Sequence, residues 1–208
     1  MTLFEELKHT IVTGNADLAK EYTEKAIQEG CSVSDILNLG LIAGMNEIGA
    51  KFKNNQIYVP DVLVAARAMH FGMAVIKPLL AESGIKEKGI LVIGTVKGDL
   101  HDIGKNLVGM MMEGAGYKVI DLGIDVPVEK FIEAVNIHKP QFVGLSALLT
   151  TTLSEMKKVI DILREKNEKV KVIVGGAPVS QEFADQIGAD AYAPDAASCV
   201  DKCNNLLA

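Results

Sequence analysis

The chain has 208 residues, of which 49% are hydrophobic and 23% are charged, and its formal net charge is −6. This composition indicates a folded protein with one large or two small cores and excludes an intrinsically disordered chain. The negative charge argues against a nucleic-acid groove or an anionic membrane surface as a partner.

Three cysteines without a paired framework fit a reducing compartment, and the acidic N-terminus is unlike a signal peptide. No apolar run is expected to reach transmembrane length, because the best candidate, residues 59–80, contains Arg67, His70 and Lys77. We therefore expect a cytoplasmic protein without a membrane partner.

The first 82 residues predict helices only. Apolar residues recur at helical spacing in four segments, which three short polar or glycine-containing breaks separate. Ser32 or Ser34 is expected to cap the third helix, and Pro60 suits the first turn of the fourth. The pattern predicts a four-helix bundle over residues 1–82, followed by a polar linker over residues 83–88.

Beyond the linker, short apolar runs alternate with amphipathic segments. Strands are expected at residues 90–94, 118–122, 142–146, 170–174 and 189–193, and helices at about 103–114, 127–138, 151–167, 179–187 and 195–207. This alternation predicts a doubly wound, Rossmann-like parallel sheet over residues 89–208. The spacing alone does not fix the strand order, and we choose the flavodoxin-like order 2-1-3-4-5.

Polar and glycine residues gather where the predicted strands end. They are Asp99, His101 and Gly104 after the first strand, Ser146 and residues 150–152 after the third, Gly175 and Gly176 after the fourth, and Tyr192 and Asp195 at the fifth, with Leu148 and Ala177 beside them. The carboxyl ends of parallel strands meet at one edge of a sheet, where open α/β folds bind ligands. The sequence therefore predicts a site at this edge.

His101 is the residue in this group best suited to chemistry. Its ring can ligate a metal through one nitrogen while Asp99 holds the other N–H. A lone loop histidine is more often simply solvated, and a zinc site needs more ligands than the pattern supplies. Neither a Walker loop nor a G-x-G-x-x-G fingerprint is present. The residues alone thus indicate a metal-ligating or acid–base histidine in an α/β crevice.

Three motifs resemble those of cobalamin-binding domains. They are D-x-H-x-x-G at residues 99–104, S-x-L at residues 146–148 and G-G at residues 175–176, at the family's spacing. The helical half also carries G-x-x-F at residues 49–52, Val59-Pro60 and an alanine-rich segment at residues 65–69. The whole chain resembles the cap plus cobalamin-binding domains of cobalamin-dependent methionine synthase, and the small corrinoid proteins of methyltransferase systems.

The resemblance implies a role for each matching residue. His101 would be the lower cobalt ligand, Asp99 would bond its ring, and Thr152, where methionine synthase has serine, would extend this relay to solvent. Other residues implied to contact the cofactor are Gly98, Leu100, Asp102, Ile103, Gly104, Ser146, Leu148, Thr150, Gly175, Gly176, Ala177 and Tyr192. Phe52, Val59 and Val62 would cap its upper face, although the pattern alone makes them ordinary bundle core.

The implied protein is a non-catalytic methyl carrier. Its cofactor would be cobalamin or a related corrinoid, carried as methylcobalamin and cycling between Co(I) and Co(III). Its partners would be a substrate-specific methyltransferase, a second methyltransferase acting on tetrahydrofolate or a thiol, and a reductive activator of Co(II). A catalytic barrel needs about 250 residues, which this chain does not provide.

Two other classes of cobalamin protein are open alternatives. A cobalamin-dependent sensor would normally add an output domain, and the small subunit of a mutase would usually lack the helical half. The methyl donor stays open among methoxylated aromatics, methylamines, methanol and betaines.

Overall fold

The computed structural model describes residues 2–83, 87–166 and 169–207. Apart from residues 114–116, the chain divides between Glu87 and Lys88 into a helical unit and an α/β unit. Residues 84–86, which fall within the linker expected at residues 83–88, lie outside the described residues.

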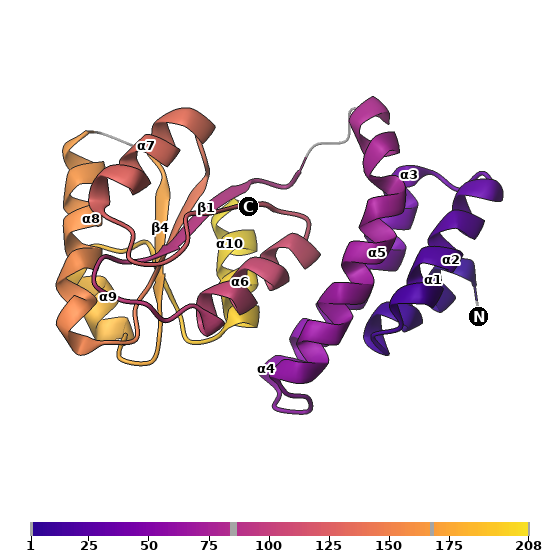
Figure 1. Cartoon of the computed structure of the whole chain (residues 1–208), viewed down its shortest axis with the longest axis horizontal. Coiled ribbons are helices and arrows are strands. Elements are labelled where there is room, and N and C mark those ends of the chain that lie inside the picture. The colour runs from indigo at the N-terminus through magenta and orange to yellow at the C-terminus, as the bar shows by residue number, and fades with distance from the viewer. Residues whose placement is uncertain (1, 84–86, 167–168, 208) are drawn as a thin grey trace. The chain divides into compact units, whose positions relative to one another are not determined.

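The helical unit confirms the helices that the apolar spacing predicts (Figure 1). Its elements are α1 (Leu3–Val12), α2 (Ala16–Gln28), the continuous run α3 (Val33–Asp35), η1 (Ile36–Ile42) and α4 (Ala43–Lys53), and α5 (Val59–Ser83). Polar side chains start them: Asn15 accepts from the Leu18 amide and Ser32 from the Asp35 amide. These caps satisfy amide groups that have no partner within the helix.

The third helix contains a π-helical segment, Ile36–Ile42, that the sequence pattern does not reveal. This segment and α4 lie against α1 through two glycines. A Cβ at Gly40 would come within 2.5 Å of the Leu7 side chain, and one at Gly44 within 2.6 Å of Ile11. The glycines therefore admit two fully buried side chains of α1.

α5 corrects one expectation. Its residues Val59–Leu80, with a mean hydropathy of 1.4, are long and apolar enough to cross a membrane, so the expectation that no run reaches that length is wrong. The run is amphipathic in the helical unit: one face is buried, and Arg67 on another face is exposed. The buried face consists of Val62, Ala65, Ala66, Ala68, Met69 and Ile76. In the bundle, α5 lies against α2, α4 and α1 (Figure 1).

The α/β unit is built on a five-stranded, all-parallel sheet in the order β2-β1-β3-β4-β5. The strands are β1 (Ile90–Thr95), β2 (Lys118–Asp121), β3 (Phe142–Ser146), β4 (Lys171–Gly175) and β5 (Ala191–Ala193). This confirms the flavodoxin-like order chosen from the sequence. β1, β3 and β4 are apolar because helices cover both faces of the sheet.

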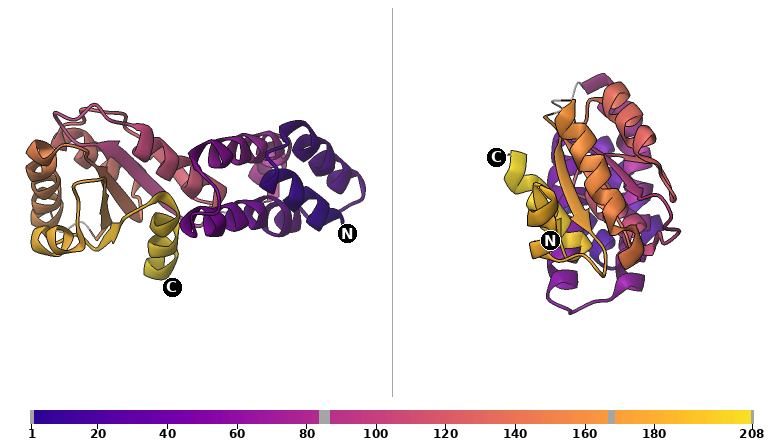
Figure 2. Two further views of the ribbon diagram at one scale, coloured as in Figure 1. Left: turned by 90° about the horizontal axis from the view of Figure 1, so that it is seen from below. Right: turned by 90° about the vertical axis from the view of Figure 1, so that its left-hand side faces the viewer.

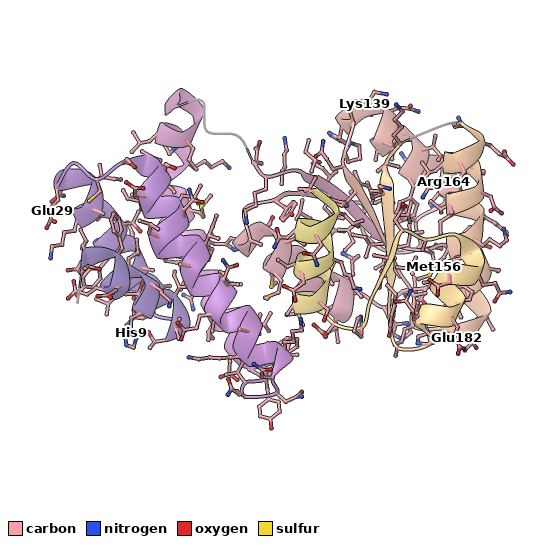
Figure 3. All side chains as sticks on the ribbon, turned by 180° about the vertical axis from the view of Figure 1, so that it is seen from behind. His9, Glu29, Lys139, Met156, Arg164 and Glu182 are labelled. Carbon is pink, nitrogen blue, oxygen red and sulfur yellow. The ribbon has the colours of Figure 1, made fainter. Side chains whose placement is uncertain are left out.

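The helices are α6 (Ile103–Gly114), α7 (Val128–His138), η2 (Thr150–Thr152), α8 (Leu153–Glu165), α9 (Gln181–Ile187) and α10 (Ala196–Leu207). α7, α8 and α9 cover one face of the sheet, and α6 and α10 cover the other (Figures 1 and 2). Met156 of α8, labelled in Figure 3, is fully buried in the first of these layers.

Strand register brings the predicted site residues into one row. Thr95 of β1 pairs with Ser146 of β3, Ser146 with Gly175 of β4, and Gly175 with Ala193 of β5. Each is at the carboxyl end of its strand, so the loops that follow leave from the same edge of the sheet. Lys139, at the end of α7, marks the opposite edge in Figure 3.

Candidate functional site

His101 stands on the loop between β1 and α6. Gly98 turns this loop with a φ of +82°, a backbone conformation that side-chain-bearing residues rarely adopt. Asp99, two residues before the histidine, is fully buried, whereas the His101 side chain is 51% exposed. The loop therefore buries the Asp99 carboxylate and exposes the His101 imidazole to solvent.

The ring of His101 has a defined tautomer. Its Nδ1 lies 2.7 Å from Asp99 Oδ1, and a carboxylate can only accept, so Nδ1 carries the proton. The Nε2 atom then has a free lone pair. Within the described residues, no hydrogen bond involves Nε2. This is the arrangement of a histidine prepared to ligate a metal.

Asp99 accepts hydrogen bonds from five donors. Oδ1 receives the ring N–H and the main-chain amide of His101, at 2.7 and 3.1 Å. Oδ2 receives the amides of Leu148 and Leu149, at 2.7 and 3.0 Å, and the Thr152 hydroxyl at 3.0 Å. Burial by itself raises the pKa of Asp99, but these hydrogen bonds together outweigh it and hold the pKa well below its usual range.

Leu149 is a participant that the sequence pattern missed. Leu148 and Leu149 are forty-nine and fifty residues from Asp99 in the sequence. Their amides reach its carboxylate because the segment after β3 lies beside the loop that follows β1. A main-chain donor leaves no mark on residue type. Only its position beside the S-x-L motif hinted at it.

Thr152 lies at the end of this network and is buried. Its hydroxyl oxygen is 3.0 Å from Asp99 Oδ2 and 2.9 Å from the Leu149 carbonyl oxygen. The single hydroxyl proton serves one of the two acceptors at a time. The structure thus brings Thr152 into contact with Asp99, as the predicted relay requires, although the side chain itself has little exposure to solvent.

Ser146, Gly175 and Gly176 form a second part of the edge. Gly176 has a φ of +125°, and a Cβ built there would overlap the carbonyl oxygen of Ala147. A Cβ at Gly175 would lie 2.9 Å from the Ala193 carbonyl oxygen. Ser146 is half-buried, and no hydrogen bond among the described residues involves its hydroxyl. These positions combine close backbone approach with an available hydroxyl.

Large apolar side chains flank the exposed imidazole. Leu100, directly before His101 in the loop, and Ile103, the first residue of α6, are 66% and 77% exposed, and Leu148 and Leu149 are also exposed. Exposed leucines and isoleucines grouped around a polar residue are typical of a binding surface. They would suit a large, flat and largely apolar ligand.

The donor set limits how a metal can bind here. No group of three or more His, Cys, Asp or Glu side chains able to hold a metal ion exists among the described residues. His101 alone cannot hold a bare ion. The site fits a metal that arrives inside a ring which supplies its other ligands.

The remaining predicted residues have varied settings. Gly98, Asp102, Gly104, Thr150 and Ala177 are exposed at the same edge, Tyr192 is half-buried in β5, and the Asp102 carboxylate accepts from the Asn106 side chain. Phe52, Val59 and Val62 belong to the helical unit, where Val62 is fully buried and the other two are half-buried.

Comparison with known proteins identifies the family to which the chain belongs. The chain matches the B12 binding domain family over residues 89–200, and a second B12 binding domain family over residues 3–77. A corrinoid protein of Desulfitobacterium hafniense is 43% identical over 100% of this chain and 98% of its own length. The dimethylamine corrinoid protein of Methanosarcina barkeri is 45% identical, over 99% and 98%.

A solved structure agrees as well. The methanol:cobalamin methyltransferase complex of Methanosarcina barkeri contains a chain that superimposes with a TM-score of 0.88 at 33% identity, covering 99% of this chain and 79% of that one. The fold and the site thus define a cobalamin-binding protein with a helical N-terminal half. The chain belongs to the family of corrinoid proteins of methyltransferase systems, and its cofactor is cobalamin or a related corrinoid.

Proposed function

We propose that this protein is a methyl carrier: it accepts a methyl group from a substrate-specific methyltransferase and yields it to a second methyltransferase. The observation that carries the proposal is the Asp99–His101 pair, which leaves Nε2 of a half-exposed imidazole free beside apolar side chains. Bound cobalamin supplies a cobalt atom that takes up and gives up methyl groups. The chain itself would bind and position it, so it is a component of a methyltransferase system without a catalytic site of its own.

The protein residues have distinct roles in this proposal. Asp99 keeps the proton of the His101 ring on Nδ1, so Nε2 is always the coordinating atom. The low pKa of Asp99 keeps its own carboxylate ionised. Thr152 contributes one of the donors that stabilise that charge. Ser146, Gly175 and Gly176 would receive the displaced benzimidazole tail, giving base-off, His-on binding.

We further propose that the helical unit is the cap over the methyl-bearing face. Phe52 and Val59 keep exposed surface, whereas Val62 is fully buried in the helical unit. An apolar cover excludes water from a reactive centre. We also propose that a reductive activator of Co(II) acts on this protein, and that the protein is cytoplasmic. It would have no membrane or nucleic-acid partner, which the net charge of −6 supports.

Methylated amines are the donors to test first, because curated relatives between 41% and 45% identical include dimethylamine and trimethylamine corrinoid proteins. Cobalamin-loaded, reduced protein would be mixed with its cognate methyltransferase and ¹⁴C-labelled methylamine, dimethylamine, trimethylamine or methanol. About one methyl group per protein should become bound with one of these donors, and none with His101→Ala under the same turnover conditions. Labelling by methanol alone, or by none of the four donors, would contradict this assignment of donor class.

A further inference from the structure

Two residues that do not contact the Asp99 carboxylate, Thr95 and Asp125, form hydrogen bonds with the main chain of the His101 loop. Thr95, the last residue of β1, is fully buried, and its hydroxyl donates to the carbonyl oxygen of His101 at 2.8 Å. This is a direct hydrogen bond between a rigid strand and the backbone of the candidate ligand. It fixes the position from which the imidazole side chain extends.

Asp125, in the loop after β2, holds the other end of the turn. Its Oδ1 accepts from the Gly98 amide at 2.7 Å, and its own amide donates to the Asp99 carbonyl oxygen at 3.0 Å. One residue therefore grips both Gly98 and Asp99. Asp125 does so with a φ of +51°, in the left-handed region that aspartate tolerates better than most residues.

The β2–α7 loop is itself attached to β1. The Thr95 amide donates to the Gly123 carbonyl and the Val126 amide donates to the Thr95 carbonyl, both at 3.0 Å, and Val96 forms a parallel bridge with Val126. Asp125 thus sits on a support that continues the sheet. Backbone held in an unusual conformation by such surroundings often serves a site.

We propose that Asp125 and Thr95 are positioning residues that pin the main chain of the His101 loop, so that the imidazole meets cobalt at one fixed distance from the sheet. This rests on the proposed His-on binding. With Gly98, Asp99 and the His101 carbonyl all pinned, any movement of the imidazole towards or away from a bound metal would be a rotation of the His101 side chain, while the main chain of the loop stays in place. The same pinning makes the axial bond sensitive to residues that never touch the cofactor.

Two matched pairs of variants separate this role from general stability. Asp125→Asn keeps both the side-chain acceptor and the tolerance of positive φ, whereas Asp125→Gly keeps the backbone conformation and removes the acceptor. Thr95→Ser keeps the hydroxyl, and Thr95→Val removes it at nearly constant shape. Melting temperatures of all four apoproteins verify that each compared variant is folded.

The first readout needs no cofactor. Amide hydrogen exchange of the apoprotein, followed by NMR, should be at least tenfold faster at Gly98 in Asp125→Gly than in the wild type, while Asp125→Asn stays within threefold of it. Thr95→Val tests the hydrogen bond from Thr95 to the His101 carbonyl oxygen. In this variant the His101 ring resonances should be broader than in Thr95→Ser. If the Gly98 exchange rate in folded Asp125→Gly and the His101 ring resonances in folded Thr95→Val are unchanged, Asp125 and Thr95 do not pin the loop, and the proposal is overturned.

The second readout uses Co(II) cobalamin bound to each variant. The ratio of histidine-bound to histidine-free cobalt, from spin resonance, should fall about tenfold in Asp125→Gly and Thr95→Val, and their conservative partners should restore it. Because tenfold corresponds to about 59 mV for a one-electron couple, the Co(II)/Co(I) midpoint potential should rise by up to about 59 mV.

The two readouts also distinguish the failure of this inference from failure of the proposed function. A wild type without histidine coupling to cobalt defeats both, whatever the exchange data show. A His-on wild type whose Asp125→Gly and Thr95→Val variants keep the same ratio and the same potential defeats the positioning role alone.

Discussion

The buried carboxylate of Asp99 accepts a 2.7 Å hydrogen bond from the ring of His101, while half of the His101 side chain stays exposed. The two residues are only two apart in the chain, yet they occupy opposite environments because Gly98 turns the loop between sheet and solvent. One residue is fixed by five donors, and the other offers a free nitrogen at the surface of the α/β unit.

His101→Ala should retain cobalamin binding. Affinity for the cofactor is expected to fall by no more than about tenfold, or about 1.4 kcal/mol, because Ser146, Gly175 and Gly176 do not depend on the imidazole. Absorption spectra of methylcobalamin on this variant should lack the signature of axial nitrogen coordination. His9→Ala, an exposed position on α1, is the control. Complete loss of cofactor would show that the axial bond dominates affinity.

Gly176→Val should abolish binding. At a φ of +125°, a branched side chain is strained and its Cβ would overlap the Ala147 carbonyl oxygen, which displaces the backbone beside Ser146. Equilibrium dialysis should show affinity reduced at least a hundredfold. Gly188→Ala provides the control, because it has a φ of +77° at the end of α9 but open space around its Cβ. Wild-type affinity in a folded Gly176→Val protein would remove this glycine from the tail site.

Gly104→Ala should separate stability from binding. Nothing in the protein lies within 4 Å of a Cβ at Gly104, and the residue is in the first turn of α6. Alanine there should stabilise the apoprotein by about 0.5–1 kcal/mol. If the motif glycine lies against the cofactor, the same change weakens cobalamin binding. Thermal unfolding and dialysis measure the two effects, and a more stable protein with unaltered affinity would exclude Gly104 from the cofactor surface.

The pH dependence of stability should reveal Asp99. Its pKa is lowered in the folded apoprotein, so the stability it contributes is fully present above the unfolded pKa of about 3.9 and declines as the pH falls towards the folded pKa. Asp99→Asn, which cannot serve all five donors, should cost about 3 kcal/mol at pH 7. Urea unfolding should show this difference shrinking by roughly 1 kcal/mol between pH 7 and pH 3. A difference that does not change with pH would mean that the carboxylate is not specially stabilised.

Much of the fold could be predicted from the sequence because its signals are local. The apolar runs of β1 and β3 and the amphipathic helices between them are visible in the residue order, and the flavodoxin-like order is one of few that such alternation allows. The predicted strand Phe142–Ser146 has these bounds in the structure. The predicted strand at residues 189–193 is shorter in the structure, where it begins at Ala191. Its start depends on contacts of Asp190 with Arg164, Lys171 and the Val172 amide, which lie far from it in the sequence.

Features that depend on tertiary contacts could not be predicted in the same way. The roles of Thr95 and Asp125 arise from hydrogen bonds between separate loops, and Leu149 acts through a main-chain amide that any residue possesses. The π-helical segment depends on packing against α1 rather than on a periodic pattern. The expectation for residues 59–80 failed for a different reason: Arg67, His70 and Lys77 are too few to lower the mean hydropathy of this alanine-, valine- and methionine-rich helix below that of a membrane span.

Spin resonance of Co(II) cobalamin bound to protein labelled with ¹⁵N-histidine tests the central claim most directly. A single ¹⁵N nucleus should split the cobalt signal into doublets, because Nε2 of His101 replaces the cofactor's own benzimidazole, and His101→Ala should abolish this splitting. Triplets from an unlabelled ¹⁴N ligand in the wild-type protein would show that benzimidazole remains bound, and would contradict base-off, His-on binding.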